Sequence, residues 1–383
     1  MTWWQSQLRR LLDMGVRGFK TDFGEQIPAD AVFSDGRTGA ELHNSYPVLY
    51  NRATWEVVRE YDGILLGRSG WAGSQAYPAV WAGDQTSDFS PWNGLPTAIV
   101  AGQSAGWSGF PYWGSDVGGY FGAPDDEVFV RWTQFAALTP IMESHGLGVR
   151  EPWLFAPSTL ETYRAFAALH ARLAPYTQSA ASEAFRTGLP IMRAMALSFP
   201  ELPDIHQDWV QYQYLYGPDL LVAPVYSWGR RRQVLFPPGE WIDFFSGARY
   251  AGPSTVEVPA RLESLPLFVR AGTLLPLLRD TRTSSASNAS NASDASSGQA
   301  LHLELYPGGS TERLLADGSR LVLDSRPGEA AMRVRVAGPE REYTLSARHA
   351  PALRLIHSSA ATVAEGSTLR WRGDAELELV QGV

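Results

Sequence analysis

Residues 1–198 alternate between short apolar runs and helical stretches, and this alternation limits the fold more than any other feature of the chain. Strands that alternate with helices form a parallel sheet with right-handed crossovers, either doubly wound or closed into a barrel. A single long helix is predicted over Leu160–Ala184. The predicted strands are Gly18–Phe23, Gly63–Leu66, Gly109–Trp113, Pro140–Ser144 and Leu189–Leu197.

Polar residues lie just after these strands or in the loops between them, namely Asp22, Arg68, Asp84, Asp116 and His145. In a (β/α)8 barrel the carboxyl ends of the strands form the rim of the active site. The chain has no glycine-rich dinucleotide fingerprint after the first strand and no phosphate-binding P-loop, which favours the barrel over the doubly wound sheet. Five strands cannot close an eight-stranded barrel, which typically needs about 250 residues. We therefore expect an α/β fold whose first part is the C-terminal part of a TIM (β/α)8 barrel, with about five βα units.

The pattern changes after Phe199, where short apolar runs alternate with turn residues. This pattern is typical of antiparallel strands, and it predicts two small β-sandwich domains. A tract rich in Ser, Asn and Ala lies between them and has no aromatic residue to bury, so we expect a flexible linker. The expected domains are a partial catalytic barrel at 1–198, a proximal β domain at 199–280, the linker at 281–299 and a distal β domain at 300–383.

Composition excludes several classes of function. The chain has 383 residues, no cysteine and a formal net charge of −8. Thiolate chemistry is therefore excluded, and the acidic balance disfavours a nucleic-acid partner. No apolar run reaches the roughly 20 residues of a membrane span, and the amphipathic start is unlike a signal peptide, so we expect no membrane partner and a cytoplasmic rather than a secreted chain. Without a His-x-His or His-Glu-x-x-His pattern, we expect no metal site and no cofactor.

Two aspartates, Asp22 and Asp84, are the candidate catalytic pair. Two carboxylates on neighbouring strand ends can flank a glycosidic bond, one ionised and one protonated. Lys20 is the only lysine among 32 basic residues, and we expect its charge to keep Asp22 ionised. A tryptophan-lined loop around Asp84 suits a proton donor. The alternative is structural: Asp22 caps a helix and Asp84 closes a turn.

Cations and aromatic rings add to this candidate site. Ten of the 14 tryptophans lie between Trp3 and Trp153, and indole faces stack on sugar rings, although a large aromatic core explains them equally well. Arg68 can bind hydroxyls or orient a carboxylate with its planar fork. A lone His145 is more often structural than catalytic. Further candidates for sugar platforms, which can equally belong to the core, are Phe19, Trp71, Trp81, Phe110 and Trp113.

Six motifs make the chain resemble glycoside hydrolase family 31, which comprises α-glucosidases, α-xylosidases, sulfoquinovosidases and related transglycosylases. The run FKTDFGEQIP resembles the nucleophile signature of this family, and RSGWAGSQAYPAVWAGD resembles its acid/base segment. Later motifs resemble the next strand ends, the histidine motif, the end of the barrel and the start of the proximal C-terminal domain. The motifs occur in order at Phe19–Pro28, Arg68–Asp84, Phe110–Tyr120, Pro140–Gly146, Leu189–Met195 and Tyr212–Val225.

The resemblance implies a role for each candidate residue. Asp22 would be the nucleophile and Asp84 the general acid/base of a retaining α-glycosidase. Glu25 and Phe19 would support the nucleophile. The residues implied to bind the substrate are Lys20, Arg68, Trp81, Trp113, Asp116 and His145.

The chain departs from the family at its start. Family members carry an N-terminal β-sandwich and three βα units before the point that corresponds to Met1. We therefore expect a fragment, a misassigned start or half of a split enzyme. Such a chain would associate with a missing N-terminal half or with further copies of itself.

The resemblance implies hydrolysis of terminal α-glycosidic bonds, with an α-linked oligosaccharide or glycoside as the substrate. We expect an α-glucosidase-like activity. The alternatives are an α-xylosidase or a sulfoquinovosidase of the same family, which the KTDFGE and WAGDQ sequences favour. An inactive sugar-binding fragment that needs the missing half is an alternative of a different class.

Overall fold

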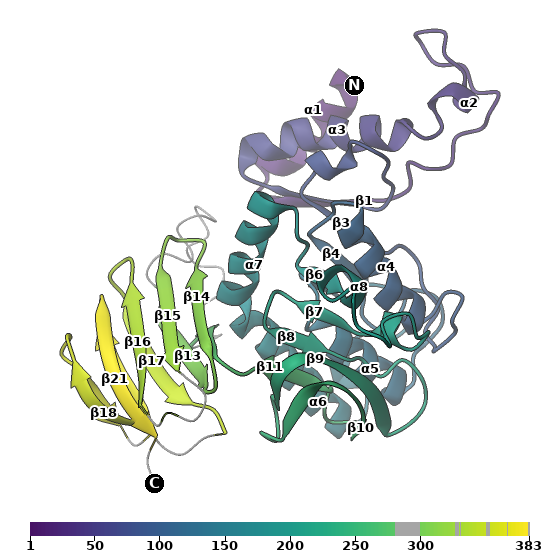
Figure 1. The fold of residues 1–383 in the computed structure, drawn as a ribbon. Helices are drawn as coiled ribbons and strands as arrows, with labels where there is room; N and C mark the ends of the chain where they lie inside the picture. The colour runs from purple at the N-terminus through teal and green to yellow at the C-terminus, as the bar shows by residue number, and fades with distance from the viewer. Residues whose placement is uncertain (280–298, 326–328, 330, 350–352, 366, 382–383) are drawn as a thin grey trace.

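The computed structural model describes residues 1–383 except 280–298, 326–328, 330, 350–352, 366 and 382–383 (Figure 1). A parallel sheet with helices leads into an antiparallel sheet, and a β-sandwich follows beside helix α7 (Ala174–Thr187). The expected partial barrel followed by antiparallel β structure is confirmed. In the part of the chain that the structure describes, no helix is both long and apolar enough to span a membrane.

The parallel sheet has five strands in the order β1-β2-β3-β4-β5. Its strands are β1 (Gly18–Thr21), β2 (Ile64–Gly67), β3 (Ala79–Trp81), β4 (Trp113–Asp116) and β5 (Ile141–Glu143). Helices α1 (Thr2–Asp13), α3 (Tyr46–Val58), α4 (Leu95–Trp107) and α5 (Asp126–Ala136) accompany these strands, together with the one-turn helix α2 (Gly39–Leu42). Short 3-10 turns lie at Arg59–Tyr61, Ser74–Ala76, Pro152–Leu154 and Val210–Tyr212.

The register of this sheet decides which side chains share a face. Lys20 is paired with Leu66, and further along the sheet Asp116 is paired with Glu143. Successive residues of a strand point to opposite faces, so Lys20, Trp81, Asp116 and Glu143 all belong to one face. The opposite face meets the helices: the Thr21 hydroxyl donates to Asn51 of α3, and the indole N–H of Trp132 in α5 donates to Ser115.

Two strand predictions are wrong in their details. The parallel strand β3 was not predicted, because it has three residues and lies in a glycine-rich stretch that resembles a loop. The predicted strand Leu189–Leu197 contains β6 (Met192–Ala194), which pairs antiparallel with β7 (Tyr214–Tyr216) instead of extending the parallel sheet. A short buried run carries no signal for the direction in which it pairs.

The predicted long helix is two helices, α6 (Pro157–Arg172) and α7. Pro175 lies in the first turn of α7. A proline has no amide hydrogen and its ring collides with the preceding turn, so it starts a helix more readily than it continues one. The break lets the two helices take different directions.

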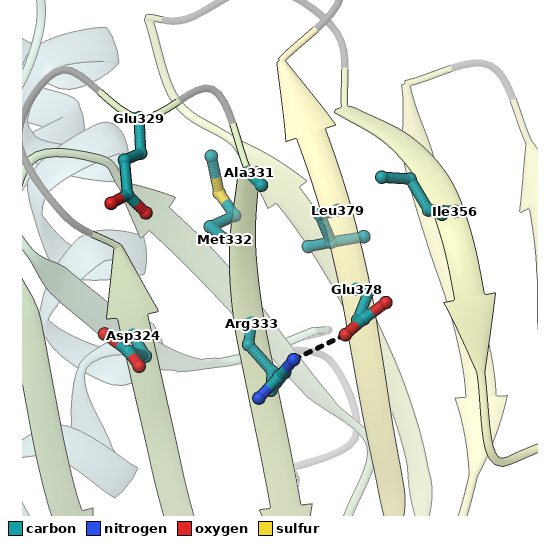
Figure 2. A pocket seen from close by; sticks show the side chains of 8 residues that line it. All are labelled: Asp324, Glu329, Ala331, Met332, Arg333, Ile356, Glu378 and Leu379. Carbon is teal, nitrogen blue, oxygen red and sulfur yellow. Dashed lines mark hydrogen bonds and ion pairs between the residues drawn. The ribbon is translucent and has the colours of Figure 1, made fainter.

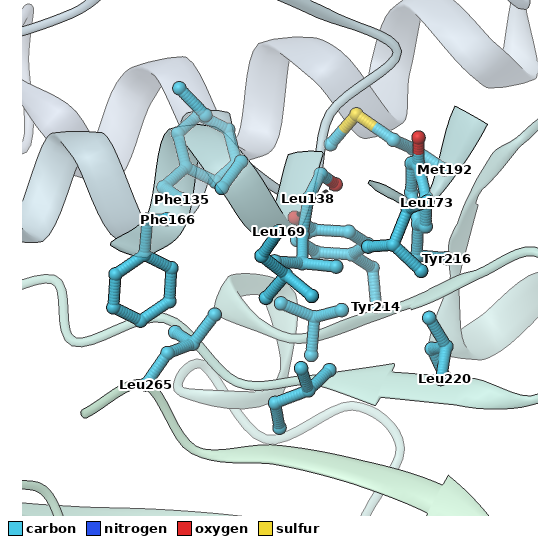
Figure 3. Packing of buried hydrophobic residues seen from close by; sticks show 14 of the residues in the cluster. Phe135, Leu138, Phe166, Leu169, Leu173, Met192, Tyr214, Tyr216, Leu220 and Leu265 are labelled. Carbon is cyan, nitrogen blue, oxygen red and sulfur yellow. Dashed lines mark hydrogen bonds between the residues drawn. The ribbon is translucent and has the colours of Figure 1, made fainter. Parts of the chain in front are cut away.

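An antiparallel sheet of six strands, in the order β10-β9-β11-β8-β7-β6, shares a buried core with these two helices. Its core joins that of the parallel sheet: Phe135 and Tyr214 are in contact across the boundary (Figure 3). The short helix α8 (Met195–Ser198) follows β6 directly. The remaining strands are β8 (Leu220–Val222), β9 (Arg231–Asp243), β10 (Arg249–Pro259) and β11 (Leu267–Arg270).

The distal sandwich has two sheets, in the orders β12-β13-β17-β20-β19 and β14-β15-β16-β21-β18. Strand β12 (Thr273–Leu278) pairs antiparallel with β13 (Leu301–Tyr306) across the predicted linker, whose residues 281–298 lie outside the described part. The other strands are β14 (Ser310–Leu314), β15 (Arg320–Ser325), β16 (Ala331–Ala337), β17 (Glu342–Ala347), β18 (Leu353–Ser358), β19 (Val363–Glu365), β20 (Thr368–Arg372) and β21 (Ala375–Gln381).

A buried ion pair ties this sandwich to the rest of the chain. Arg313 of β14 reaches Asp219, which lies in the turn between β7 and β8. Its guanidinium also lies 4.7 Å from the centre of the Tyr176 ring in α7. A buried charge is stable only when a partner compensates it, so this contact fixes the sandwich against α7.

Candidate active site

The first candidate carboxylate, Asp22, follows β1 in a tight turn. Phe23 and Gly24 have positive φ angles of 62° and 90°. A side chain on Gly24 would lie 2.7 Å from the Tyr50 ring, so this position needs glycine. The Tyr50 hydroxyl donates to the Asp22 carbonyl at 2.9 Å, and the Phe23 amide donates to the Asp22 carboxylate at 2.9 Å. The turn therefore holds the Asp22 side chain half-exposed at the sheet edge.

Arg68, which follows β2, forms salt bridges with three carboxylates. One of its terminal nitrogens, Nη1, lies 2.6 Å from Asp22 Oδ1 and 3.7 Å from Asp84 Oδ2. The other, Nη2, lies 2.5 Å from Glu25 Oε1. The guanidinium stacks 4.5 Å from the centre of the Phe23 ring. The structure thus brings both predicted catalytic aspartates to one cation.

Asp84 sits in the loop after β3, and neighbouring segments hold this loop. The Asn93 side-chain amide donates to the Asp84 carbonyl at 3.0 Å. The amides of Tyr120 and Phe121, in the loop after β4, both donate to the Gln85 carbonyl at 2.8 Å. The two loops therefore form one unit beside the candidate carboxylates.

Arg150 is buried beneath these two loops and was not predicted as a functional residue. Its guanidinium donates to the carbonyls of Gly119, Tyr120 and Gly122 and to the Ser87 hydroxyl. One rigid side chain therefore fixes the loop after Asp84 to the loop after Asp116.

Lys20 forms a second, buried cluster. Its ammonium lies 2.9 Å from Asp116 Oδ1, 3.3 Å from Glu143 Oε2 and 4.4 Å from the centre of a Trp81 ring. The Asp116 side chain is 0 % exposed. Burial raises the pKa of Asp116, and the hydrogen bond from Lys20 opposes that shift.

The expected pairing of Lys20 with Asp22 is wrong. The cation against Asp22 is Arg68, while Lys20 is turned to Asp116 and Glu143. Lys20 lies within β1 on the inner face of the sheet, whereas Asp22 lies in the turn beyond the strand. Alternation alone would put residues 20 and 22 on the same face, so the turn after the strand, with its positive φ angles at Phe23 and Gly24, decides which cation Asp22 meets.

Glu143 was missed, although it is the last residue of β5 and stands two residues before His145. Burial raises its pKa to about 7, Lys20 opposes the shift, and the neighbouring charge of Asp116 adds to it. A carboxylate at the carboxyl end of a predicted strand was the available signal.

Two predicted site residues lie on the other face of the sheet. Phe19 packs with Leu8, Leu12 and Val57 on the helices. Trp113 belongs to the buried core, with its ring 6.1 Å from that of Phe135. This face is opposite to that of Lys20 and Trp81, so the alternation along the strands does not favour a substrate-binding role for either residue.

His145 is exposed beyond β5, with its ring 5.3 Å from that of Tyr120. It acts electrostatically on Asp116, so it lies beside the Lys20 cluster. Within the described ranges, no three His, Asp or Glu residues are arranged to hold a metal ion.

Two hollows differ in character. A cavity of about 670 Å³ adjoins Arg68 and Trp81 and is lined by further aromatic rings, including Trp71 and Phe110. A smaller hollow of about 290 Å³ lies on the distal sandwich (Figure 2), with an Arg333–Glu378 ion pair across it. The first hollow is also lined by Val80, Trp113 and Ala101 of α4, on the side of the sheet that meets the helices, and neither Asp22 nor Asp84 lines it. The candidate site is therefore defined by its charged side chains and not by either hollow.

The sequence matches two family models. Residues 1–180 match the model described as the glycosyl hydrolases family 31 TIM-barrel domain, and residues 188–275 match the glycosyl hydrolase family 31 C-terminal domain. These two matches confirm the resemblance that the motifs indicated.

Curated relatives and a solved structure agree with these matches. The chain is 37% identical to an isomaltosyltransferase of Sporosarcina globispora, over 72% of this chain and 26% of that protein. It is 36% identical to a sulfoquinovosidase of Agrobacterium fabrum, over 69% of this chain and 41% of that protein. The chain thus spans less than half the length of these relatives.

The structure resembles that of a cycloalternan-forming enzyme from Listeria monocytogenes, solved in complex with a pentasaccharide substrate. The TM-score is 0.83 at 26% identity, and the match covers 100% of this chain and 40% of that one. Family models, relatives and fold agree, and the chain belongs to glycoside hydrolase family 31.

Proposed function

We propose that this chain carries the two catalytic carboxylates of a retaining α-glycosidase that removes terminal α-linked sugars. Asp22 is the nucleophile and Asp84 is the general acid/base. The observation that carries this proposal is that one nitrogen of Arg68 contacts both carboxylates, at 2.6 Å and 3.7 Å. The two contacted oxygens are therefore no further apart than the sum of these distances, and this upper limit allows the roughly 5–5.5 Å between the carboxyl groups of retaining glycosidases.

The environment of Asp22 suits a nucleophile. A carboxylate attacks through an oxygen lone pair, and the Arg68 guanidinium, 2.6 Å from Asp22 Oδ1, orients this carboxylate by a charge-assisted contact. The Asp22 side chain is 51 % exposed, so a substrate has access to it. Glu25 takes the other nitrogen of Arg68 and so orients the fork that faces Asp22.

The reaction has two balanced steps. In the first, an Asp22 oxygen bonds to the anomeric carbon, the glycosidic C–O bond breaks, and Asp84 gives its proton to the departing oxygen. In the second, Asp84 takes a proton from water, the water oxygen bonds to the anomeric carbon, and the ester to Asp22 breaks. Two inversions retain the α configuration.

The Lys20 cluster supplies the sugar-binding part of the proposal. Its ammonium and the Asp116 carboxylate are suited to the hydroxyl groups of a sugar ring, and Trp81 offers an apolar surface beside them. His145 stands at the same edge of the sheet. A terminal α-glucoside is the substrate class that we propose, with an α-xyloside or a sulfoquinovoside as alternatives.

Turnover and covalent trapping test the proposal. The chain should release p-nitrophenol from p-nitrophenyl α-glucoside or α-xyloside, and 5-fluoro-α-glucosyl fluoride should add one glycosyl group to Asp22, located by peptide mass spectrometry. Asp22→Asn should abolish both, while Asp84→Ala should regain turnover with azide, which needs no general base. Asp35→Asn, in an exposed loop, is the matched control. Label on another residue, or neither label nor release with any α-glycoside, would contradict the proposal.

A further inference from the structure

The buried cluster around Lys20 contains three polar atoms that have no hydrogen-bond partner among the described residues. They are Asp116 Oδ2, Glu143 Oε1 and the indole Nε1 of Trp81. The Asp116 side chain is fully buried, and Trp81 is 4 % exposed. Buried polar atoms are nearly always hydrogen-bonded, so such a group of unpartnered atoms indicates a place where a polar ligand binds.

Glu143 differs from its neighbours in this cluster. Its Oε2 holds Lys20 at 3.3 Å, while Oε1 is unpartnered. The proposed mechanism gives this carboxyl group no role in bond making or breaking. A residue that is buried beside the sugar-binding groups and is unused by the chemistry is a candidate for controlling which sugar is accepted.

The net charge of the cluster determines whether it favours neutral or anionic sugars. Lys20 alone would attract a sugar with an anionic substituent, such as a carboxylate or a sulfonate. Asp116 balances this one positive charge, and an ionised Glu143 makes the cluster net negative. Water screens the cluster little because its side chains are largely buried, so the excess charge acts strongly on a bound sugar.

We propose that Glu143 is a specificity-determining residue that makes this site select neutral sugars and reject sugars with an anionic substituent. This inference rests on the proposed function and narrows its substrate class. Glu143 holds one side of the Lys20 ammonium, accepts a hydroxyl group of a neutral sugar at Oε1, and repels an anion at the same place. A sulfoquinovoside is thereby the alternative that the cluster disfavours.

The rejection of anions should depend on pH. Burial raises the pKa of Glu143 to about 7, so its ionised fraction grows as the pH rises from 6 to 8. Lys20 from β1 and Asp116 from β4 are the charged groups that act on it directly, and His145, Asp84 and Arg150 act on Asp116. The preference for neutral sugars should therefore increase with pH in this range.

The test compares p-nitrophenyl α-glucoside with p-nitrophenyl α-glucuronide, whose carboxylate is ionised throughout this range. We expect the ratio of their kcat/KM values to rise on the order of tenfold between pH 6 and pH 8. Glu143→Gln should remove this rise, and Glu143→Asp should keep it because the charge remains. Glu161→Gln, exposed on α6, is the control. An equal rise in the wild type and in Glu143→Gln would overturn the proposal.

A binding measurement separates this inference from the proposed function. Titration calorimetry with glucose and glucuronate at pH 6 and pH 8 reports the same preference without turnover. A preference for glucose that grows with pH only when residue 143 is acidic supports the role of Glu143, even if no glycoside is hydrolysed. Turnover with an unchanged preference in Glu143→Gln would leave the proposed function standing and refute the role of Glu143.

Discussion

Two clusters of charged side chains lie at the carboxyl edge of the parallel sheet. Both are built around one cation, but their carboxylates differ in how deeply they are buried. In each cluster one cation forms salt bridges with more than one carboxylate. Arg68 contacts Asp22, Glu25 and Asp84. Lys20 contacts Asp116 and Glu143. The Asp22 side chain is 51 % exposed, whereas that of Asp116 is 0 % exposed. Water keeps the first group accessible for chemistry, while the low dielectric of the second makes every unpaired charge costly.

The difference predicts that removing Lys20 affects stability most. Lys20→Met leaves two largely buried carboxylates without their cation, and breaking a buried pair in this way costs about 3–5 kcal/mol. Urea unfolding followed by circular dichroism measures the loss. Adding Glu143→Gln to Lys20→Met should restore part of it, because one of the uncompensated charges is gone. If Lys20→Met unfolds at the same urea concentration as the wild type, the two carboxylates do not need a cation and the cluster is not buried in the folded chain.

The pH dependence of stability sharpens the same comparison. The folded-state pKa of Glu143 is raised from 4.5 to about 7, so between these values the folded chain binds more protons than the unfolded chain. Its contribution to stability is therefore highest below about pH 4.5 and falls by about 3 kcal/mol as the pH rises through 7. Unfolding midpoints at pH 5 and pH 8 measure this slope. Glu143→Gln should remove that part of it, and an unchanged slope would contradict the assignment.

The exposed cluster should respond in activity rather than in stability. Arg68→Ala removes the cation shared by Asp22 and Asp84, and we expect kcat/KM to fall about 100-fold, which corresponds to about 2.7 kcal/mol. Arg68→Lys keeps the charge but loses the planar fork, so its effect should be intermediate. The Arg68 side chain is only 14 % exposed, but its three carboxylate partners are 33 % to 51 % exposed, so the loss of stability in urea should be smaller than that of Lys20→Met. If Arg68→Ala instead loses much stability and keeps its kcat/KM, then the Arg68 cluster is structural and is not part of the catalytic machinery.

Substitution of Arg150 would show whether the link between the two loops keeps the two clusters in the correct relative position. Arg150→Ala removes the donors that join the loop after Asp84 to the loop after Asp116, and kcat should fall about tenfold with a smaller change in KM. Guanidinium ion at millimolar concentration should restore part of kcat in Arg150→Ala and should have no effect on the wild type. If guanidinium ion does not restore kcat, and Arg150→Ala also lowers the free energy of unfolding, then Arg150 has only a structural role.

The smallest effect is expected far from both clusters. Arg333 and Glu378 form an exposed ion pair at the hollow of the distal sandwich. Exposed pairs of this kind contribute about 0.2–1 kcal/mol, so Arg333→Ala should lower stability within that range and leave kcat/KM unchanged. An effect on turnover would give the distal sandwich a part in catalysis.

Much of this arrangement could be predicted from the sequence. Polar residues at the ends of buried runs placed Asp22, Arg68 and Asp116 at one edge of a sheet, because the carboxyl ends of parallel strands meet there. The pairing of charges could not be predicted. Which cation faces Asp22 depends on the turn at Phe23 and Gly24, and the pattern of charges along the chain does not reveal the geometry of that turn.

Short strands limited the rest of the prediction. Strand β3 has three residues, and β6 joins the antiparallel sheet although its sequence resembles the other buried runs. Hydrophobic periodicity needs a longer window than three residues, and it carries no information on strand direction. Glu143 was missed for a related reason: the predicted strand ends at Ser144, one residue beyond the true end of β5, so Glu143 was placed inside the strand.

The ion pair between Arg313 and Asp219 has a consequence for how this chain can be divided. A boundary drawn before the distal sandwich would leave Asp219 and the Tyr176 ring facing solvent where Arg313 had been, and β12 would lose the partner strand β13. The sandwich is thus not a detachable appendage. A chain that ends before β13 would therefore lose the contact between Arg313 and α7 as well as the pairing of β12.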